Sequence, residues 1–334
     1  MTEKIFTNWT PDLTAKWGKA PLKATHRLSD HPLFSLDALA DLIDGYPRQH
    51  YALVQMGPQG SARRTWREGD IGGLKGGDVI DAIKQGRMWL NLRNVSGIDK
   101  RYRELLDAAF DEVRNNVPGY ETYNRTSGIL ISSPNAQVYY HADLPGQSLW
   151  QIHGRKRVYV YPNTPPFITP EQLENIALFE VEVDMRYEPS YDAGAQVFEI
   201  SGGEMLHWPL NAPHRVVNAD CLNVSFTTEH WTNDLRNAYA VNYANGILQI
   251  RDGANENQLA IRHSPENVPG QPVSAEDRQL IVTTRIGDQK IGVKTSGMSS
   301  GIYRLRFELP TDDDSGIGVL IGGEHDPDDE RLIH

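Results

Sequence analysis

The chain has 334 residues, 39% of them hydrophobic and 23% charged, a composition typical of a protein with a sizeable apolar core. Its net charge of −11 argues against nucleic acid or an anionic membrane as a partner, because both select a basic face. A single cysteine, Cys221, excludes a disulfide within the chain. The sequence also shows no apolar leader and no run of about 20 apolar residues. We therefore expect a cytoplasmic protein.

The first region, residues 1–120, mixes helix and strand patterns. Ser35 is a candidate helix N-cap, followed by apolar residues at helical spacing. Strand patterns follow at 51–56 and 88–92, and a helix is expected over about Lys100 to Arg114. We expect these N-terminal α/β elements to pack on the region that follows.

Between about 126 and 232 the apolar period changes to two, which is typical of β-strands. Turns rich in Pro, Gly and Asn separate the candidate strands, which lie at 128–132, 136–141, 147–153, 157–162, 179–185, 196–200, 204–208, 213–218 and 221–228. Many short strands at this spacing predict an antiparallel sandwich or barrel. We take 121–232 as the core domain of the chain.

The third region, residues 233–334, has another texture. Asn233 and Asp234 cap a predicted helix that runs to about Ile250. A loop rich in Asn, Pro and Gly follows, and then strand candidates at 280–285, 289–294 and 302–308. The sequence predicts a small C-terminal α+β unit here and gives it no function.

Three residues of the core domain form a candidate metal site. His141 and Asp143 are two positions apart, so on a strand they would project to the same face. His214, from a later strand, would complete a set of two imidazoles and one carboxylate. That set, with open positions left over, is the facial triad of non-haem Fe(II) oxygenases.

The residues around His214 strengthen this interpretation. Gly203 precedes Pro209, His214 and Asn218 at a spacing close to the second cupin motif, with Asn211 where a glycine is usual. The glycine permits a tight turn into a strand, and the proline helps to end that strand. His207 is a rival ligand just before the turn, which we interpret as structural or as lying near the pocket mouth.

The segment 151–162 resembles the strand pair that follows the metal motif in JmjC-type cupin oxygenases, most of all in their asparaginyl-hydroxylase branch. In that branch a lysine thirteen residues after the metal-binding aspartate pairs with the distal carboxylate of 2-oxoglutarate. Lys156 stands thirteen residues after Asp143. A 2-oxoglutarate dianion needs a cation deep in the barrel, and lysine supplies a point charge there.

The resemblance implies a mainly β fold with helical additions, built on a double-stranded β-helix (cupin or jelly-roll) core. It implies Fe(II) as the metal, 2-oxoglutarate as co-substrate and O2 as oxidant, with succinate and CO2 as co-products. Asp143 occupies the position of the carboxylate ligand to the metal. The resemblance therefore favours hydroxylation, or demethylation through hydroxylation, over halogenation.

The co-substrate pocket departs from the family pattern at one position. A threonine three residues before the first histidine also contacts 2-oxoglutarate in the asparaginyl hydroxylases, and here that position is Val138. The missing hydroxyl could come instead from Tyr140, Ser225 or Thr227, and the sequence does not choose among them. Gln147 takes the place of a family asparagine and could keep an amide contact.

The leading hypothesis is thus a dioxygenase that hydroxylates a protein side chain or a small molecule. The alternative is a non-catalytic metal-binding cupin with a regulatory or ligand-binding role. The predicted helix after Asn233 resembles the dimerising C-terminal helices of the superfamily, so a homodimer is also an expectation. The sequence leaves the substrate and its binding residues open.

Overall fold

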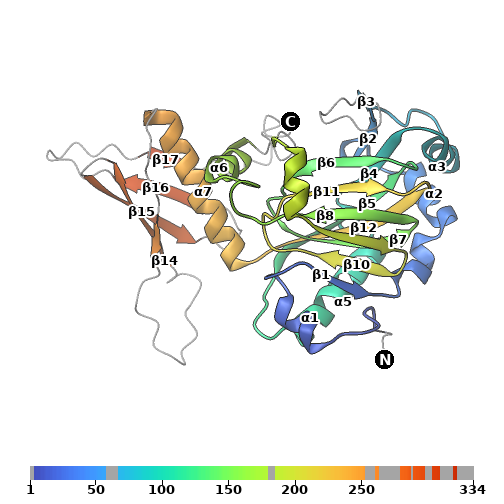
Figure 1. The fold of residues 1–334 in the computed structure, drawn as a ribbon, viewed down its shortest axis with the longest axis horizontal. Coiled ribbons are helices and arrows are strands. Elements are labelled where there is room, and N and C mark those ends of the chain that lie inside the picture. Colours follow the sequence, from blue (N-terminus) through green and yellow to red (C-terminus); the bar gives the residue numbers. More distant parts are fainter. Residues whose placement is uncertain are drawn as a thin grey trace. The chain divides into compact units, whose positions relative to one another are not determined.

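The computed structural model describes residues 4–57, 67–179 and 185–252, and further on the strands at 260–262, 279–286, 289–297, 303–308 and 319–321. Within these ranges, side chains are described up to residue 246, except at 179 and 244. The chain divides into two compact units, Met1–Arg236 and Asn237–His334 (Figure 1). Within the described ranges, no helix has the length and apolar character that crossing a membrane requires.

Two antiparallel sheets form the framework of the first unit. The larger has the strand order β1-β10-β7-β12-β5-β4-β2-β3, and the smaller has the order β6-β11-β8-β9. Their core strands are β5 (Tyr123–Ser132), β6 (Gln137–His141), β7 (Gly146–His153), β8 (Arg155–Val160), β9 (Gln196–Ser201), β10 (Glu204–His207), β11 (His214–Asn218) and β12 (Asn223–Trp231). Strands β5 to β12 cross between the two sheets at every step except β8 to β9, which pair within the smaller sheet, as in a double-sheet jelly roll. This topology confirms the predicted fold class.

The first 120 residues extend the larger sheet at both edges. Strand β1 (Leu22–Thr25) pairs with β10, and β4 (Met88–Leu92) pairs with β5. Beyond β4 lie β2 (Tyr51–Gln55) and β3 (Arg67–Gly69). The N-terminal strands are therefore part of the same sheet as the jelly roll. They cover what would otherwise be its open edges.

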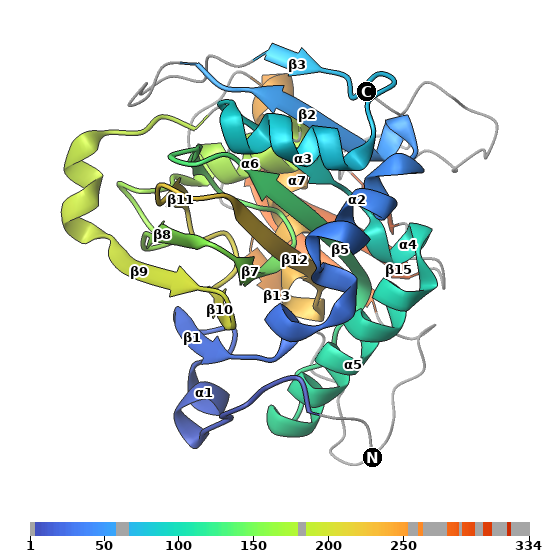
Figure 2. The same cartoon turned by 90° about the vertical axis from the view of Figure 1, so that its right-hand side faces the viewer.

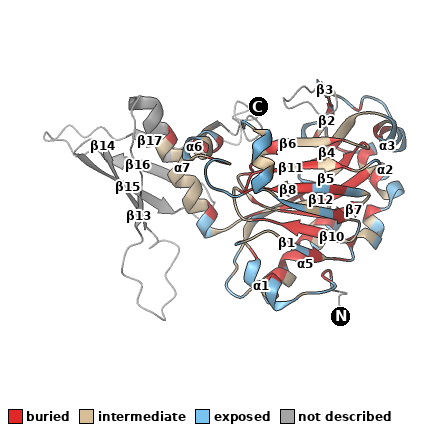
Figure 3. Ribbon diagram, in the orientation of Figure 1, coloured by how far each residue is buried: buried red, intermediate tan, exposed pale blue. Residues whose placement is uncertain are grey.

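Helices cover the outer face of the larger sheet (Figure 2). The helices of this N-terminal part are α1 (Pro11–Lys16), α2 (Leu36–Asp44), α3 (Gly76–Gln85), α4 (Val95–Ile98) and α5 (Lys100–Asn116), with short 3-10 turns at Leu28–Asp30, Pro32–Phe34 and Arg48–His50. Leu39, Ile83 and Tyr102 from these helices are buried with Trp150 and Phe226 of the sheet. Buried residues are correspondingly dense along the strands (Figure 3).

A second, smaller apolar cluster lies between the two sheets. Leu149 and Leu206 from the larger sheet meet Val158, Ile200 and Val216 from the smaller one. Strand β7 is thus buried on both faces, since Leu149 points between the sheets while Trp150 points toward the helices. The inner face is where the predicted site residues of β8, β11 and β12 are found.

One strand prediction falls mostly outside the described residues. Strand structure was expected over 179–185, but helix α6 runs over Pro170–Phe179, and residues 180–184 lie outside the described part. A 3-10 turn at Pro189–Gly194 then leads into β9. Helix α6 was missed because Ile168 and Ile176 are buried against Ala142 of the jelly roll, a tertiary contact that local periodicity does not reveal.

The second unit begins within helix α7 (Asn233–Asp252), close to the helix predicted from Asn233. Its five-stranded antiparallel sheet contains β13 (Ala260–Arg262), β14 (Gln279–Ile286), β15 (Gln289–Gly297), β16 (Tyr303–Glu308) and β17 (Val319–Ile321). Strands β14, β15 and β16 lie where the sequence places its three C-terminal strand candidates.

Two turns with positive φ bring β11 into position. Gly203 has φ 88° between β9 and β10, a conformation that glycine adopts without steric cost. Asn211, at the position where cupins usually have glycine, has φ 57° before β11. Its side-chain amide donates a hydrogen bond of 2.9 Å to the backbone oxygen of Asp143. Asparagine thus supplies both the left-handed turn and a link to the segment that carries the carboxylate.

Substitution of Asn211 should separate these two contributions. Asn211→Ala forces a Cβ-bearing residue without a polar side chain into the left-handed region, so we expect the free energy of unfolding to fall by about 1–2 kcal/mol. Asn211→Gly loses the hydrogen bond but fits the turn, so its loss should stay below about 1 kcal/mol. Urea denaturation of the full chain measures both. Equal losses would show that the turn conformation is not what Asn211 stabilises.

Candidate metal and co-substrate site

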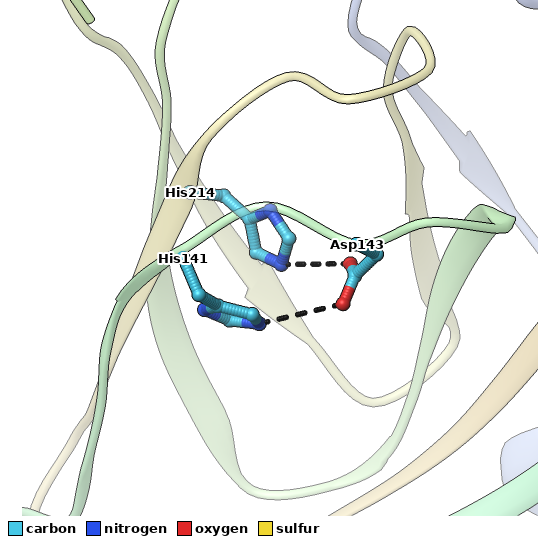
Figure 4. Close-up of side chains that lie close together, drawn as sticks. All are labelled: His141, Asp143 and His214. Atoms are coloured by element: carbon cyan, nitrogen blue, oxygen red, sulfur yellow. Dashed lines mark ion pairs between the residues drawn. The ribbon is translucent and has the colours of Figure 1, made fainter. Parts of the chain in front are cut away.

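His141, Asp143 and His214 converge in the structure, as the sequence predicts (Figure 4). His141 ends β6 and His214 begins β11, and the two residues are direct partners in the antiparallel pair. Asp143 follows two residues after the end of β6, not on the strand as expected. The intervening Ala142 is buried against Ile168 and Ile176 of the α6 region. His141 and Asp143 therefore turn to a common side.

The distances in this group suit a single cation. His141 Nε2 is 3.6 Å from Asp143 Oδ1, and His214 Nε2 is 3.3 Å from Asp143 Oδ2. One ligand atom from each residue lies within 4.8 Å of the others. Adjacent ligands about 2.1 Å from an octahedral metal are about 3 Å apart, so small side-chain movements bring all three onto one ion.

Backbone carbonyls fix the orientation of both imidazoles. His141 Nδ1 donates to Tyr139 O at 2.7 Å, and His214 Nδ1 donates to Ala212 O at 3.1 Å. A carbonyl only accepts, so each Nδ1 carries the proton and each Nε2 presents its lone pair to the site. Burial lowers the pKa of His214 well below its usual value, which keeps its ring neutral, as a metal ligand must be.

The Asp143 carboxylate completes the donor set. Its residue is 8% exposed, and Oδ2 is buried without a hydrogen-bond partner among the described residues. Burial raises the pKa of this carboxyl, while His141 acts in the opposite direction. Two imidazole nitrogens and a carboxylate oxygen that lacks a donor fit a divalent cation.

Lys156 is the second charged group inside the barrel. The residue is 2% exposed on β8, and its Nζ donates to Ser225 Oγ on β12 at 2.6 Å. Among the described residues, the structure pairs this ammonium with no carboxylate. Burial lowers the pKa of Lys156 to about 7, so the cation is held at a cost in free energy. An ammonium with two further donors facing the interior is suited to bind an anion.

A polar network holds Lys156 and Ser225 in place. Ser225 Oγ donates to Gln151 Oε1 at 2.8 Å, and the Gln151 amide donates to Asn223 Oδ1 at 2.8 Å. Gln151, Asn223 and Ser225 are each fully buried. Because every member has a partner, the network fixes the position of the ammonium, not only its presence.

Lys156 and the triad are spaced along the same pair of strands. On the β8–β11 ladder, Lys156 is opposite Asn218 while His214 is opposite Val160, a separation of four residues or about 13 Å. Asn218 is itself fixed by hydrogen bonds to Ser132 Oγ and Ser133 O. A lysine side chain and a five-carbon dicarboxylate together can span that separation.

The remaining predicted co-substrate residues divide into two groups. Ser225 contacts Lys156, and Thr227 follows it two positions later on the same face of β12. Gln147 is on the corresponding face of β7, opposite Glu229 of β12. Tyr140 is not brought to the site, because it directly precedes His141 and projects from the other face of β6. Its hydroxyl donates to Phe167 O, and its ring packs on Tyr161.

His207, the rival ligand, lies on the opposite side of the larger sheet from the triad. It stacks on Trp17 with ring centroids 4.3 Å apart. Its Nδ1 lies 2.8 Å from Gln147 O, and its Nε2 accepts from Gly18 N at 3.2 Å. Both ring nitrogens are therefore engaged, and its role is structural.

The sequence analysis missed one ionisable residue of the inner face, Glu229. It follows Thr227 by two positions on β12 and interacts electrostatically with Asp143. Burial, and then the Asp143 carboxylate, raise the pKa of Glu229 to about 7. The signal that could have found it is the two-residue spacing Ser225, Thr227, Glu229 on one predicted strand.

No protein-family model and no curated protein sequence matches the chain. Among solved structures, it is similar to Escherichia coli YcfD, with a TM-score of 0.49 and 18% identity over 81% of this chain and 63% of that chain. YcfD described as a ribosomal oxygenase in complex with cobalt and 2-oxoglutarate matches with a TM-score of 0.47 and 19% identity, over 80% of this chain and 62% of that one. The chain spans less than two thirds of the length of these structures.

Removal of one imidazole tests the metal site. We expect the full chain to bind one Co²⁺, and His214→Ala to weaken that binding by about 100-fold or more, because two protein ligands remain. The visible absorption of Co²⁺ during titration measures both affinities. His50→Ala, in a turn before β2, is the control and should bind as the wild type does. Unchanged Co²⁺ affinity in His214→Ala would contradict the assignment.

Substitution of Lys156 should stabilise the ligand-free protein. Lys156→Met keeps the length of the side chain and removes a buried charge, while Ser225 still donates to Gln151. We expect the free energy of unfolding at pH 7 to rise by about 1–2 kcal/mol. The unfolded lysine binds its proton up to a higher pH than the folded one, so the wild type should gain stability between about pH 7 and 10, and the variant should not. Urea denaturation across that range measures the difference.

Proposed function

We propose that this chain is an Fe(II)- and 2-oxoglutarate-dependent oxygenase that hydroxylates a protein side chain or a small molecule. The observation that carries the proposal is the pairing of two sites in one barrel. Two imidazoles and a carboxylate converge on a cation site, and a buried ammonium lies further along the same strands. A site that binds only a metal does not need a buried lysine. A site that binds a metal and a chelating dianion needs both the metal ligands and a cation for the dianion.

In this proposal His141 Nε2, Asp143 and His214 Nε2 hold the iron on one face, which leaves positions for a chelating co-substrate and for O2. When bound, the iron with 2-oxoglutarate and O2 supplies the oxidising chemistry, with succinate and CO2 as co-products. The protein contributes orientation. The carbonyls of Tyr139 and Ala212 hold the two imidazoles in the tautomer that presents Nε2.

Lys156 is the proposed partner of the distal carboxylate of 2-oxoglutarate. Its Nζ donates a hydrogen bond to Ser225 Oγ, and the network through Gln151 holds it inside the barrel. Ser225 is the hydroxyl best placed to replace the one missing at Val138, because it already lies 2.6 Å from the ammonium. Thr227 and Gln147 remain proposed contacts nearer the metal.

The carboxylate ligand also bears on the reaction. Asp143 fills the position that a halide would need, so the proposed outcome is hydroxylation, or demethylation that proceeds through hydroxylation. Because Fe(II) persists in a reducing environment, the proposed location is the cytoplasm. A homodimer through the region of α7 is proposed from the resemblance of that helix.

Anaerobic titration with Fe(II) and then 2-oxoglutarate tests the proposed function. We expect a weak visible charge-transfer band when both are present, and succinate after O2 is admitted. Lys156→Met should bind iron as the wild type does, but should weaken 2-oxoglutarate about 10- to 100-fold, since a charge-assisted contact is lost.

Arg155→Met is the matched control, because Arg155 is the exposed neighbour of Lys156 on β8. It should leave both affinities unchanged. Iron binding with neither the band nor succinate would favour the alternative, a non-catalytic metal-binding cupin. Equal losses of iron and 2-oxoglutarate in Lys156→Met would contradict the role given to the lysine.

A further inference from the structure

The segment 161–195 joins β8 to β9 and contains α6 and the 3-10 turn at Pro189–Gly194. We call it the α6 insertion, of which the structure describes residues 161–179 and 185–195. Neighbouring side chains on a strand face opposite sides, so the residues next to His141 and His214 point away from the metal site. The α6 insertion packs on this outer side, where it contacts the neighbours of the metal ligands.

The first contact is made at Tyr140, the residue before His141. The hydroxyl of Tyr140 donates to the backbone oxygen of Phe167 at 2.6 Å. Its ring packs against those of Tyr187 and Tyr191, with centroid distances of 5.5 and 5.9 Å. Residues from both described parts of the α6 insertion therefore fix the end of β6, from which His141 projects.

The second contact holds the two residues that flank Asp143. Ala142 precedes this ligand and Leu144 follows it. Both pack in one apolar cluster with Ile168 and Ile176 of the α6 insertion. Asp143 lies beyond the end of β6, so this packing supports its backbone where the strand ladder does not.

The third contact is made by Arg215, the residue after His214. Its guanidinium forms an ion pair with Asp192 of the α6 insertion, through Nη2 to Oδ2 and Nε to Oδ1. The hydroxyls of Tyr161 and Tyr187 also donate to Asp192 Oδ1, at 2.6 and 2.9 Å. Asp192 thus accepts four hydrogen bonds and ties the insertion to the strand that begins at His214.

We propose that the α6 insertion positions the metal triad, and that Asp192 is a positioning residue that acts through Arg215 on His214. The inference rests on the proposed function for its metal and adds to it the element that supports the metal ligands. One segment holds a neighbour of each ligand, so a shift of that segment turns the ligands as well. A site that is loose by about 1 Å loses its function, so metal affinity depends on the contacts of the insertion.

Removal of the Asp192 charge tests the inference. Asp192→Asn keeps the size of the side chain and an oxygen for the tyrosine hydroxyls, but loses the charge that Arg215 binds. We expect the affinity of the full chain for Co²⁺, measured by visible absorption during titration, to fall about 10-fold. Tyr140→Phe, which removes only the hydroxyl that Phe167 accepts, should lower it about threefold.

Glu199→Gln is the matched control. It removes another arginine–carboxylate pair, to Arg157 at 2.7 Å between β8 and β9, that includes no neighbour of a metal ligand. Its Co²⁺ affinity should equal that of the wild type. Urea denaturation without metal establishes that each variant is folded under the titration conditions, so a loss of stability alone does not change the measured affinity.

The outcomes separate the inference from the proposed function. If the wild type binds no Co²⁺, the metal site fails and the proposed function with it. If the wild type binds Co²⁺ and folded Asp192→Asn binds it equally well, or Glu199→Gln loses as much affinity, the inference alone is overturned. If Asp192→Asn does not fold, Tyr140→Phe decides, and an unchanged affinity there overturns the inference.

Discussion

The exclusion of water from the space between the two sheets is the constraint on which the site depends. Asp143, Lys156 and His214 are each less than one tenth exposed. Desolvation raises the pKa of Asp143 and lowers those of Lys156 and His214, so it acts against every charge in the barrel. The proposed partners, a cation at the triad and a dianion at Lys156, would reverse these costs, because electrostatic attraction is strongest where water is absent.

The second apolar core makes this arrangement rigid. The larger sheet has helices on its outer face and the barrel on its inner face, so β7 and β12 are fixed from both sides. Trp150 and Phe226 alternate along these strands with Gln151 and Ser225. The same strand residues that pack the helices thereby set the register of the polar network under Lys156. The candidate metal ligands and the ammonium are held by different strands of one packed unit, as a preorganised site requires.

The sequence predicts the residues of the site better than it predicts the elements around them. The two-residue spacing of His141 and Asp143, the position of His214 after a turn, and the place of Lys156 are all local regularities of strands. What the sequence could not supply depends on tertiary structure. Helix α6 is stabilised by burial against Ala142. Asparagine adopts the left-handed conformation at Asn211 but other conformations elsewhere, so the residue type alone does not predict this turn.

Tyr140 and Glu229 illustrate opposite errors. Tyr140 carries the right chemistry, but alternation from His141 places it on the outer face, where Phe167 accepts its hydroxyl hydrogen. Glu229 was not singled out in the sequence, yet alternation from Ser225 places it on the inner face. In both cases the face of the strand that carries the side chain, not the residue type, decides its role. Strand register is therefore a better guide to a site inside a barrel than composition is.

The order of charges along the pocket gives it a direction. The Lys156 ammonium lies at one end, beside Ser225, and the His141, Asp143 and His214 group lies four residues further along the β8–β11 ladder. In the proposed function, a dicarboxylate would place one carboxylate at Lys156 and the other toward the triad. The two charged sites on β8 and β11 therefore define the two ends of the proposed co-substrate position, and their separation along the strands sets the length of the ligand that fits.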